Sequence, residues 1–118
     1  MYYDAENEKG LGMAGLNFAD SAHYAEPQNG KQNIAQFEFI PWVLSQYATI
    51  EQARSAIEKI NLVGTTFDSR YPAAKMHWII ADKSGAITVE PTESGLKIYD
   101  NAPGVLTNEP PFDMQMFN

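Results

Sequence analysis

The segment NEKGLGMAGLNF, residues 7–18, constrains the fold more than any other part of the chain. Its glycines Gly10, Gly12 and Gly15 match the G-x-G-x-x-G pattern of dinucleotide-binding folds. That fold needs a strand before the glycines, a helix beginning at them and an acidic residue about 20 positions later. Instead, a polar run precedes Gly10 at residues 4–9, and turn-forming residues follow too closely for a long helix. The pattern therefore gives only weak support to nucleotide binding.

The same segment is better explained as a β-strand from about residue 10 to residue 18. Glycine or apolar residues occupy both alternating sets of positions, so neither face of the strand is polar. Most of these side chains are small, which indicates a strand packed on both sides with little room for bulk. The two sets are Leu11, Met13 and Gly15 on one face and Gly12, Ala14 and Leu16 on the other.

The composition is that of one ordinary globular domain. Of the 118 residues, 44% are hydrophobic and 19% are charged, as in folded rather than disordered chains. No apolar run approaches the ~20 residues of a membrane helix. The formal net charge of −7 disfavours nucleic acid and anionic membrane surfaces as partners.

The chain contains no cysteine, which excludes disulfides and thiolate metal sites. His23 and His77 have no third ligand at metal-binding spacing, so we expect both to be structural. We therefore expect no metal and no other cofactor.

Two helices are expected in the first half of the chain. The first is a short helix over Phe37–Gln46. Thr49 and Gln52 form a capping box for the second helix, in which Arg54 is expected to pair with an acidic residue of its own helix. The candidate acidic partners are Glu51 and Glu58. The apolar face of this helix comprises Ile50, Ala53, Ile57 and Ile60.

Strands dominate the second half. Residues 19–36 are rich in turn-forming residues and predict a long loop. After Lys75, apolar strands alternate with turns at the spacing of an antiparallel meander. The fold class is therefore α+β with antiparallel sheet. The expected strands are Leu62–Phe67, Met76–Asp82, Ala86–Pro91, Leu96–Asp100 and Val105–Thr107.

Four segments together resemble one family. They are residues 7–18, FEFIPWVL at 37–44, HWIIADK at 77–83 and GVLTN at 104–108. In this order they resemble the choloylglycine hydrolases, which comprise conjugated bile acid hydrolases and penicillin V acylases. The resemblance covers essentially the whole chain. It implies an N-terminal-nucleophile fold, in which two antiparallel sheets are stacked between helix layers as an αββα sandwich.

Enzymes of this family use an N-terminal cysteine as nucleophile, and this chain contains none. We therefore expect residues 1–118 to be a single partial domain, an interior segment of a larger hydrolase that is inactive by itself. The resemblance implies a bacterial cytoplasmic enzyme with conjugated bile acids as substrate. Open sheet edges predict association into homo-oligomers or with the remainder of the parent chain.

Asn17 and Asn108 are the expected catalytic residues. The resemblance implies that both amides donate to the oxyanion formed on the scissile carbonyl, a role that suits a neutral donor. Asparagine at Asn17 resembles the bile acid hydrolases, since penicillin V acylases tend to have tyrosine there. On local grounds alone, the turn before Pro110 explains Asn108 better than a catalytic role does, and capping of a turn at a strand end explains Asn17 better.

Phe18, His23 and Tyr24 are candidates for lining a steroid-sized apolar pocket. Two alternatives to a bile acid hydrolase remain open. One is a penicillin V acylase, and the other is a catalytically dead truncated product that only binds ligand or associates with itself.

Overall fold

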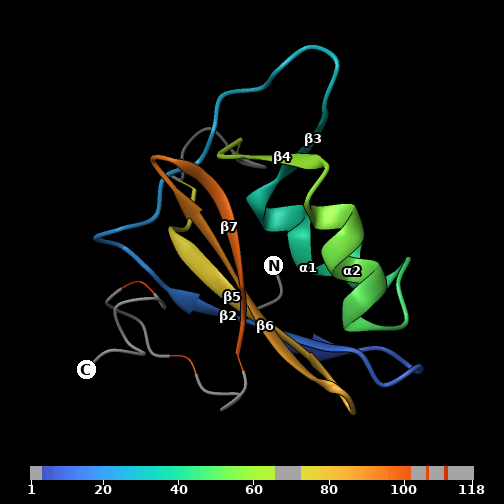
Figure 1. Ribbon diagram of the computed structural model, residues 1–118. Helices are drawn as coiled ribbons and strands as arrows, with labels where there is room; N and C mark the ends of the chain where they lie inside the picture. Colours follow the sequence, from blue (N-terminus) through green and yellow to red (C-terminus); the bar gives the residue numbers. More distant parts are fainter. Residues whose placement is uncertain (1–3, 66–72, 102–105, 107–110, 112–118) are drawn as a thin grey trace.

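The computed structural model describes residues 4–65, 73–101, 106 and 111, and its main element is a five-stranded antiparallel sheet (Figure 1). The strand order is β1-β2-β5-β6-β7, and β3 and β4 form a separate parallel pair. This mixture confirms the predicted α+β class. The elements are β1 Asp4–Glu6, β2 Gly12–Asn17, β3 Gln32–Ala35, the 3-10 helix η1 Gln36–Glu38, α1 Phe39–Leu44, α2 Ile50–Ile57, β4 Ile60–Val63, β5 Met76–Asp82, β6 Gly85–Thr92 and β7 Gly95–Asp100.

Strands β5, β6 and β7 form the meander that the turn spacing predicts. In the first turn, Asp82 Oδ1 accepts a hydrogen bond from Ser84 N at 2.7 Å. In the second, Thr92 Oγ1 donates to the carbonyl of Gly95 at 2.7 Å. The φ angle of Gly95 is +112°, a conformation that favours glycine. The predicted strand Met76–Asp82 matches β5 at both ends.

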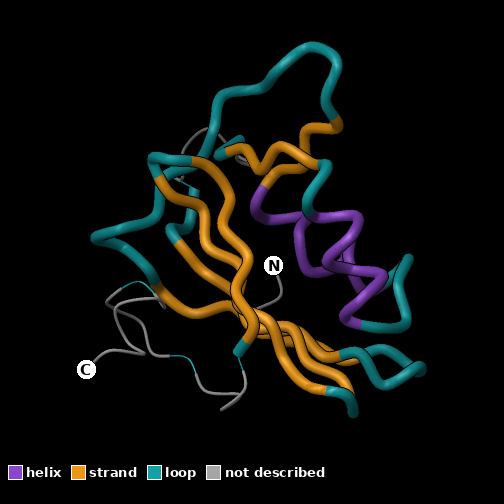
Figure 2. Tube along the Cα trace, viewed as in Figure 1, coloured by secondary structure: helices purple, strands orange, loops and turns teal. Residues whose placement is uncertain are grey.

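Both helices lie on the same side of the five-stranded sheet (Figure 2). Trp78 and Ile80 of β5 share one buried core with Val43 of α1 and Ile57 of α2. Phe39 meets Trp78 edge-on, with ring centroids 4.7 Å apart and an interplanar angle of 81°. Each large apolar side chain buried in this layer contributes about 1.5–3 kcal/mol to stability.

Gly15, in the middle of β2, marks the position where the helix-covered face has least room. A Cβ atom at this position would lie 2.3 Å from Met76 Cε and 3.0 Å from Trp78 Nε1. Side chains of β5 therefore fill the space above β2. The prediction of a strand with little room for bulk is confirmed on this face.

Helix α2 begins at the predicted cap. Thr49 Oγ1 accepts a hydrogen bond from Gln52 N at 3.2 Å. A residue of the sheet adds a second contact, because Asp82 Oδ2 accepts from Ile50 N at 2.9 Å. Hydrogen bonds from the Ser84 side chain and the Ile50 backbone hold the pKa of Asp82 below its usual value. The helix start is thus determined both locally and by the end of β5.

The long loop predicted for residues 19–36 is wrong at its end, where β3 forms. Its first two residues are exposed and its last two buried, so the segment lacks the alternation that marks a strand. β3 forms because it pairs with β4, which lies far away in sequence. β1, also unpredicted, is a short and mostly exposed edge strand that forms by pairing with β2.

The second helix differs from its prediction in two ways. Ile60 is the first residue of β4 and reaches the core from that strand rather than from the helix. Arg54 pairs with Asp100 of β7, with an Nη2–Oδ1 distance of 2.5 Å, and not with Glu51 or Glu58. The prediction is wrong because α2 packs beside the sheet, where a strand carboxylate lies within reach of the guanidinium.

The remaining predicted bounds need smaller corrections. The first helix is divided into η1 and α1 and ends at Leu44. The strand expected over Leu62–Phe67 is β4, which begins at Ile60 and ends at Val63. The strand expected over Val105–Thr107 lies outside the described residues except for Leu106, which belongs to no strand.

Candidate functional site

Asn17 is the last residue of β2, and its Cα pairs with that of Met76 at the start of β5. Its side chain is exposed and makes no hydrogen bond to another described residue. An amide in this state can donate both of its N–H groups to a ligand oxygen. Asn108, the other expected oxyanion donor, lies outside the described residues, so its role stays a prediction.

Phe18 follows Asn17 and is fully buried. Its ring stacks on that of His77, with centroids 4.2 Å apart and an interplanar angle of 9°. Its backbone N–H donates to the carbonyl of Lys75 at 2.8 Å, and its carbonyl accepts from Ala22 N at 2.8 Å. Phe18 therefore fixes the end of β2 from the interior of the protein.

Tyr24 connects the loop after β2 to the chain before β5. Its hydroxyl donates to the carbonyl of Ala74 and accepts from Met76 N, the latter at 3.0 Å. Burial raises the pKa of Tyr24 to about 12. A Cβ atom added at Gly64 would lie 3.3 Å from the Tyr24 ring, so the aromatic ring also packs against the chain after β4.

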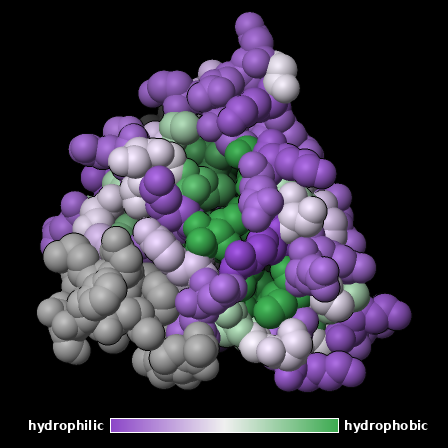
Figure 3. Space-filling model, viewed as in Figure 1, coloured by the Kyte–Doolittle hydropathy of each residue, from purple (hydrophilic) through white to green (hydrophobic). Residues whose placement is uncertain are grey.

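A groove of about 650 Å³ lies between α2, β4 and the β6–β7 hairpin. Its lining includes Ile57 and Ile98, together with the exposed His23. Figure 3 shows apolar side chains gathered in a strip between the strands and the helices, with hydrophilic residues on both sides. The other described candidates, Asn17, Phe18 and Tyr24, do not line this groove. Of the described candidates for a steroid-sized pocket, His23 therefore lines this groove, whereas Phe18 and Tyr24 do not.

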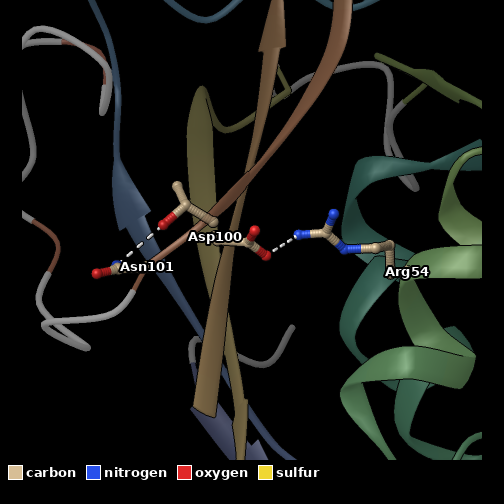
Figure 4. Close-up of polar contacts among 4 residues, drawn as sticks. Arg54, Asp100 and Asn101 are labelled. Carbon is tan, nitrogen blue, oxygen red and sulfur yellow. Dashed lines mark hydrogen bonds and ion pairs between the residues drawn. The ribbon is translucent and has the colours of Figure 1, made fainter.

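The helix-free face of the sheet carries fully buried polar side chains. His77, Thr88 and Glu90 alternate with core residues along β5 and β6 and point away from the helices. His77 Nδ1 lies 3.0 Å from Glu90 Oε2. Asn101 Nδ2 donates to Thr88 Oγ1 at 3.0 Å (Figure 4).

The sequence predicts a structural role for His77, whereas Glu90 is not among the predicted site residues. The signal for Glu90 was its position in the otherwise apolar middle of β6. A buried carboxylate is costly unless it is paired and hydrogen-bonded. A glutamate at such a position therefore indicates a partner on the neighbouring strand.

The ion pair of Arg54 and Asp100 connects α2 to β7 (Figure 4). The Asp100 side chain is 88% exposed and that of Arg54 is 33% exposed. Solvent screening limits an exposed pair of this kind to about 0–1 kcal/mol. The contact therefore contributes little to holding the helix against the sheet.

Within residues 4–65 and 73–101, no group of three or more His, Cys, Asp or Glu side chains is placed to hold a metal ion. No helix in this part of the chain is long and apolar enough to cross a membrane.

The profile of the linear amide C–N hydrolases, choloylglycine hydrolase family, matches residues 1–118. This chain belongs to the choloylglycine hydrolase family. One relative in the family is the bile salt hydrolase/transferase of Lactiplantibacillus plantarum, which is 50% identical over 118 residues. The match covers 100% of this chain and 36% of that relative. The conjugated bile acid hydrolase of Lactobacillus gasseri is 40% identical over 119 residues, which are 99% of this chain and 38% of the relative.

Solved structures of choloylglycine hydrolases share the fold. A crystal structure of conjugated bile acid hydrolase from Clostridium perfringens has a TM-score of 0.94 and 40% identity, covering 98% of this chain and 36% of that one. Penicillin V acylase from Agrobacterium tumefaciens has a TM-score of 0.79 and 25% identity, covering 97% and 34%. The predicted α+β fold of the N-terminal-nucleophile type is therefore confirmed. The chain spans little more than a third of the length of these proteins.

Proposed function

We propose that this chain is the part of a bile acid amide hydrolase that binds the oxyanion. The enzyme would cleave the amide that joins glycine or taurine to a bile acid. The observation that carries the proposal is the exposed amide of Asn17 at the end of β2, which makes no hydrogen bond to another described residue. Membership of the choloylglycine hydrolase family and 40–50% identity to relatives named for bile salts or bile acids support it.

In the proposed reaction, a cysteine sulfur attacks the amide carbonyl, forms a C–S bond and leaves an anionic oxygen. Asn17 and Asn108 donate hydrogen bonds to this oxyanion, and neutral donors do so without losing a proton. The C–N bond then breaks. The amine of glycine or taurine leaves with the thiol proton, which the α-amino group of the cysteine transfers. Water hydrolyses the thioester and releases the bile acid.

The proposed nucleophile is not among the 118 residues, which contain no cysteine. We propose that residues 1–118 are a single partial domain, an interior segment of a larger bacterial cytoplasmic enzyme. The match covers only 36% of the Lactiplantibacillus plantarum relative, which supports the proposal that these residues are part of a larger enzyme. The chain alone should then give no turnover of glycocholate.

The test uses a hybrid enzyme, in which residues 1–118 replace the matching segment of the Lactiplantibacillus plantarum bile salt hydrolase/transferase. The relative supplies the segments that the 118 residues lack, including the proposed cysteine nucleophile. We expect it to release glycine from glycocholate and taurine from taurocholate, measured as free amine. A folded hybrid enzyme without amide hydrolysis would show that these residues do not support the reaction.

Asn17→Ala in the hybrid enzyme tests the oxyanion role. Loss of one such donor lowers kcat by about 10²–10³-fold with little change in KM. Asn29→Ala is the matched control, since Asn29 is also exposed but lies in the loop before β3. An equal effect of both substitutions on kcat would contradict the assignment.

A penicillin V acylase is the second candidate, because the fold also matches that of the Agrobacterium tumefaciens enzyme at 25% identity. Comparing kcat/KM of the hybrid enzyme for glycocholate and phenoxymethylpenicillin separates the two. A clear preference for the penicillin would favour the acylase. Calorimetric titration of the 118-residue chain with glycocholate tests the remaining alternative, a product that binds ligand without hydrolysis.

A further inference from the structure

The buried pair of His77 and Glu90 takes no part in the proposed reaction, yet it lies directly beside the end of β2. Both side chains are fully buried, and His77 Nδ1 is 3.0 Å from Glu90 Oε2. This hydrogen bond between the imidazole and the carboxyl group holds the His77 ring in one orientation. His77 Nε2 is buried without a hydrogen-bond partner among the described residues.

The oriented imidazole holds Phe18. The two rings are nearly parallel, 9° apart in plane and 4.2 Å apart at their centroids. The backbone of Phe18 is fixed independently, through its N–H to Lys75 and its carbonyl to Ala22. Neither the ring nor the peptide of Phe18 can therefore rotate without breaking contacts.

Asn17 stands between two constrained neighbours. Phe18 follows it, and Leu16, which precedes it, pairs with His77 across the β2–β5 ladder. Asn17 itself pairs with Met76, and the backbone of Phe18 bonds to Lys75, just before β5. Residues 16–18 are therefore all held against residues 75–77. The pairing with β5 and the packing of Phe18 on His77 therefore hold the backbone on both sides of the exposed Asn17 side chain.

We propose that His77, oriented by Glu90, is a positioning residue that holds the Asn17 amide toward the oxyanion through the Phe18 ring. The inference rests on the proposed function, in which Asn17 is the donor. The buried polar pair would therefore raise kcat by positioning the donor, although neither residue contacts the substrate in the proposed reaction.

A double-mutant cycle in the hybrid enzyme tests this chain of contacts. His77→Asn keeps a donor that can reach Glu90 but removes the ring on which Phe18 stacks. We expect it to lower kcat by about 10–100-fold, the size of effect that small misplacements have, with KM nearly unchanged. In the Asn17→Ala background the same substitution should change kcat by less than about twofold, because residues that act as one unit are not additive.

Two further variants separate positioning from general damage to the fold. Phe18→Leu removes the stack from the other side and should be equally non-additive with Asn17→Ala. This variant decides the question where His77→Asn fails to fold. Glu90→Gln keeps a side-chain oxygen that can accept a hydrogen bond from Nδ1–H of His77, so this variant should retain most of the activity. Ile57→Val, in the core of α2, is the control for a small loss of stability and should be additive.

The outcomes are distinct. Equal losses of kcat in both backgrounds would make His77 merely structural and overturn the proposal. A folded hybrid enzyme that is inactive without any substitution would overturn the proposed function itself, and this inference with it. Non-additivity of both His77→Asn and Phe18→Leu, with additivity of Ile57→Val, would support the positioning role.

Discussion

Two buried or half-buried polar side chains in this protein, Tyr24 and Asn61, each join two segments that are far apart in the sequence. Tyr24 joins the loop after β2 to residues 74–76, with sequence separations of 50 and 52. Asn61 in β4 donates to the carbonyl of Glu26 and to Asn33 Oδ1, both at 2.8 Å. Such groups are costly to bury alone, so each contact stabilises one particular arrangement of the chain.

Tyr24→Phe should lower the free energy of unfolding by about 1–3 kcal/mol, because it leaves the buried N–H of Met76 without its acceptor. The aromatic ring remains to pack near Gly64. Urea denaturation followed by circular dichroism measures the change. Tyr47→Phe is the matched control, and we expect a change within about 0.5 kcal/mol, as for surface substitutions that remove no buried contact. Equal effects would mean that the hydroxyl bridge is unimportant.

The raised pKa of Tyr24 also predicts a pH dependence. The folded protein favours the neutral phenol, with a pKa of about 12 against the ordinary value of 10.0. This contribution to stability is fully present below the unfolded pKa and is lost as pH rises from 10.0 through about 12. Stability measured across that range should fall more steeply for the unsubstituted protein than for Tyr24→Phe.

At the scale of elements, one side chain holds the β1–β2 turn against the end of α1. Asn7 Nδ2 donates to the carbonyls of Leu44 at 3.0 Å and Tyr47 at 2.8 Å. Asn7 Oδ1 accepts from Lys9 N at 3.0 Å and Leu11 N at 3.1 Å. Leu44 is the last residue of α1, and carbonyls at a helix end lack intrahelical partners. A side chain of the β1–β2 turn therefore satisfies this carbonyl and also that of Tyr47, just after the helix.

Asn7→Ala should therefore lower the free energy of unfolding by about 2–4 kcal/mol, since hydrogen bonds each contribute about 0.5–1.5 kcal/mol. Asn7→Asp keeps the acceptor for the turn but loses both hydrogen bonds donated to the carbonyls of Leu44 and Tyr47, so its effect should be intermediate. The exposed Asn29→Ala is the control. A loss below about 0.5 kcal/mol for Asn7→Ala would show that the turn and the helix are held by apolar packing alone.

At the scale of the whole molecule, the two outer strands of the sheet are where another protein chain could pair with it. Among the described strands, β1 pairs only with β2 and β7 only with β6. Each outer strand therefore has one edge without a strand partner in this part of the chain. Strand edges of this kind are templates for pairing with another chain.

The 118-residue chain should accordingly associate into homo-oligomers. Size-exclusion chromatography with light scattering, over a range of protein concentrations, measures the mass directly. The hybrid enzyme, in which the remainder of a hydrolase surrounds the segment, is the comparison. A stable 13.2 kDa monomer at every concentration would contradict this expectation.

Patterns that depend on neighbours in sequence were predictable. The apolar segment Met76–Asp82 and the turns after it specify β5, β6 and β7, because short strand-like segments separated by turn residues are typical of an antiparallel meander. The cap at Thr49 specifies the start of α2 for a similar local reason. The residues around Asn17 carry the family resemblance, and the profile match confirms that family.

Contacts between distant segments were not predictable. β3 becomes a strand only by pairing with β4. Arg54 pairs with a residue of β7, and the buried Glu90 of β6 pairs with His77 on the neighbouring strand β5. β3 and Arg54 are not distinguished locally from loop or surface positions. Glu90 stands out by its apolar surroundings in β6, but its partner cannot be read from neighbouring residues. The energies of all three contacts come from partners that chain folding brings together. The sequence by itself determined the family and the meander, and it pointed to Asn17 as a candidate residue. Only the tertiary structure showed that the Asn17 side chain is exposed and which contacts hold the backbone beside it, because those contacts join segments that are distant in the sequence.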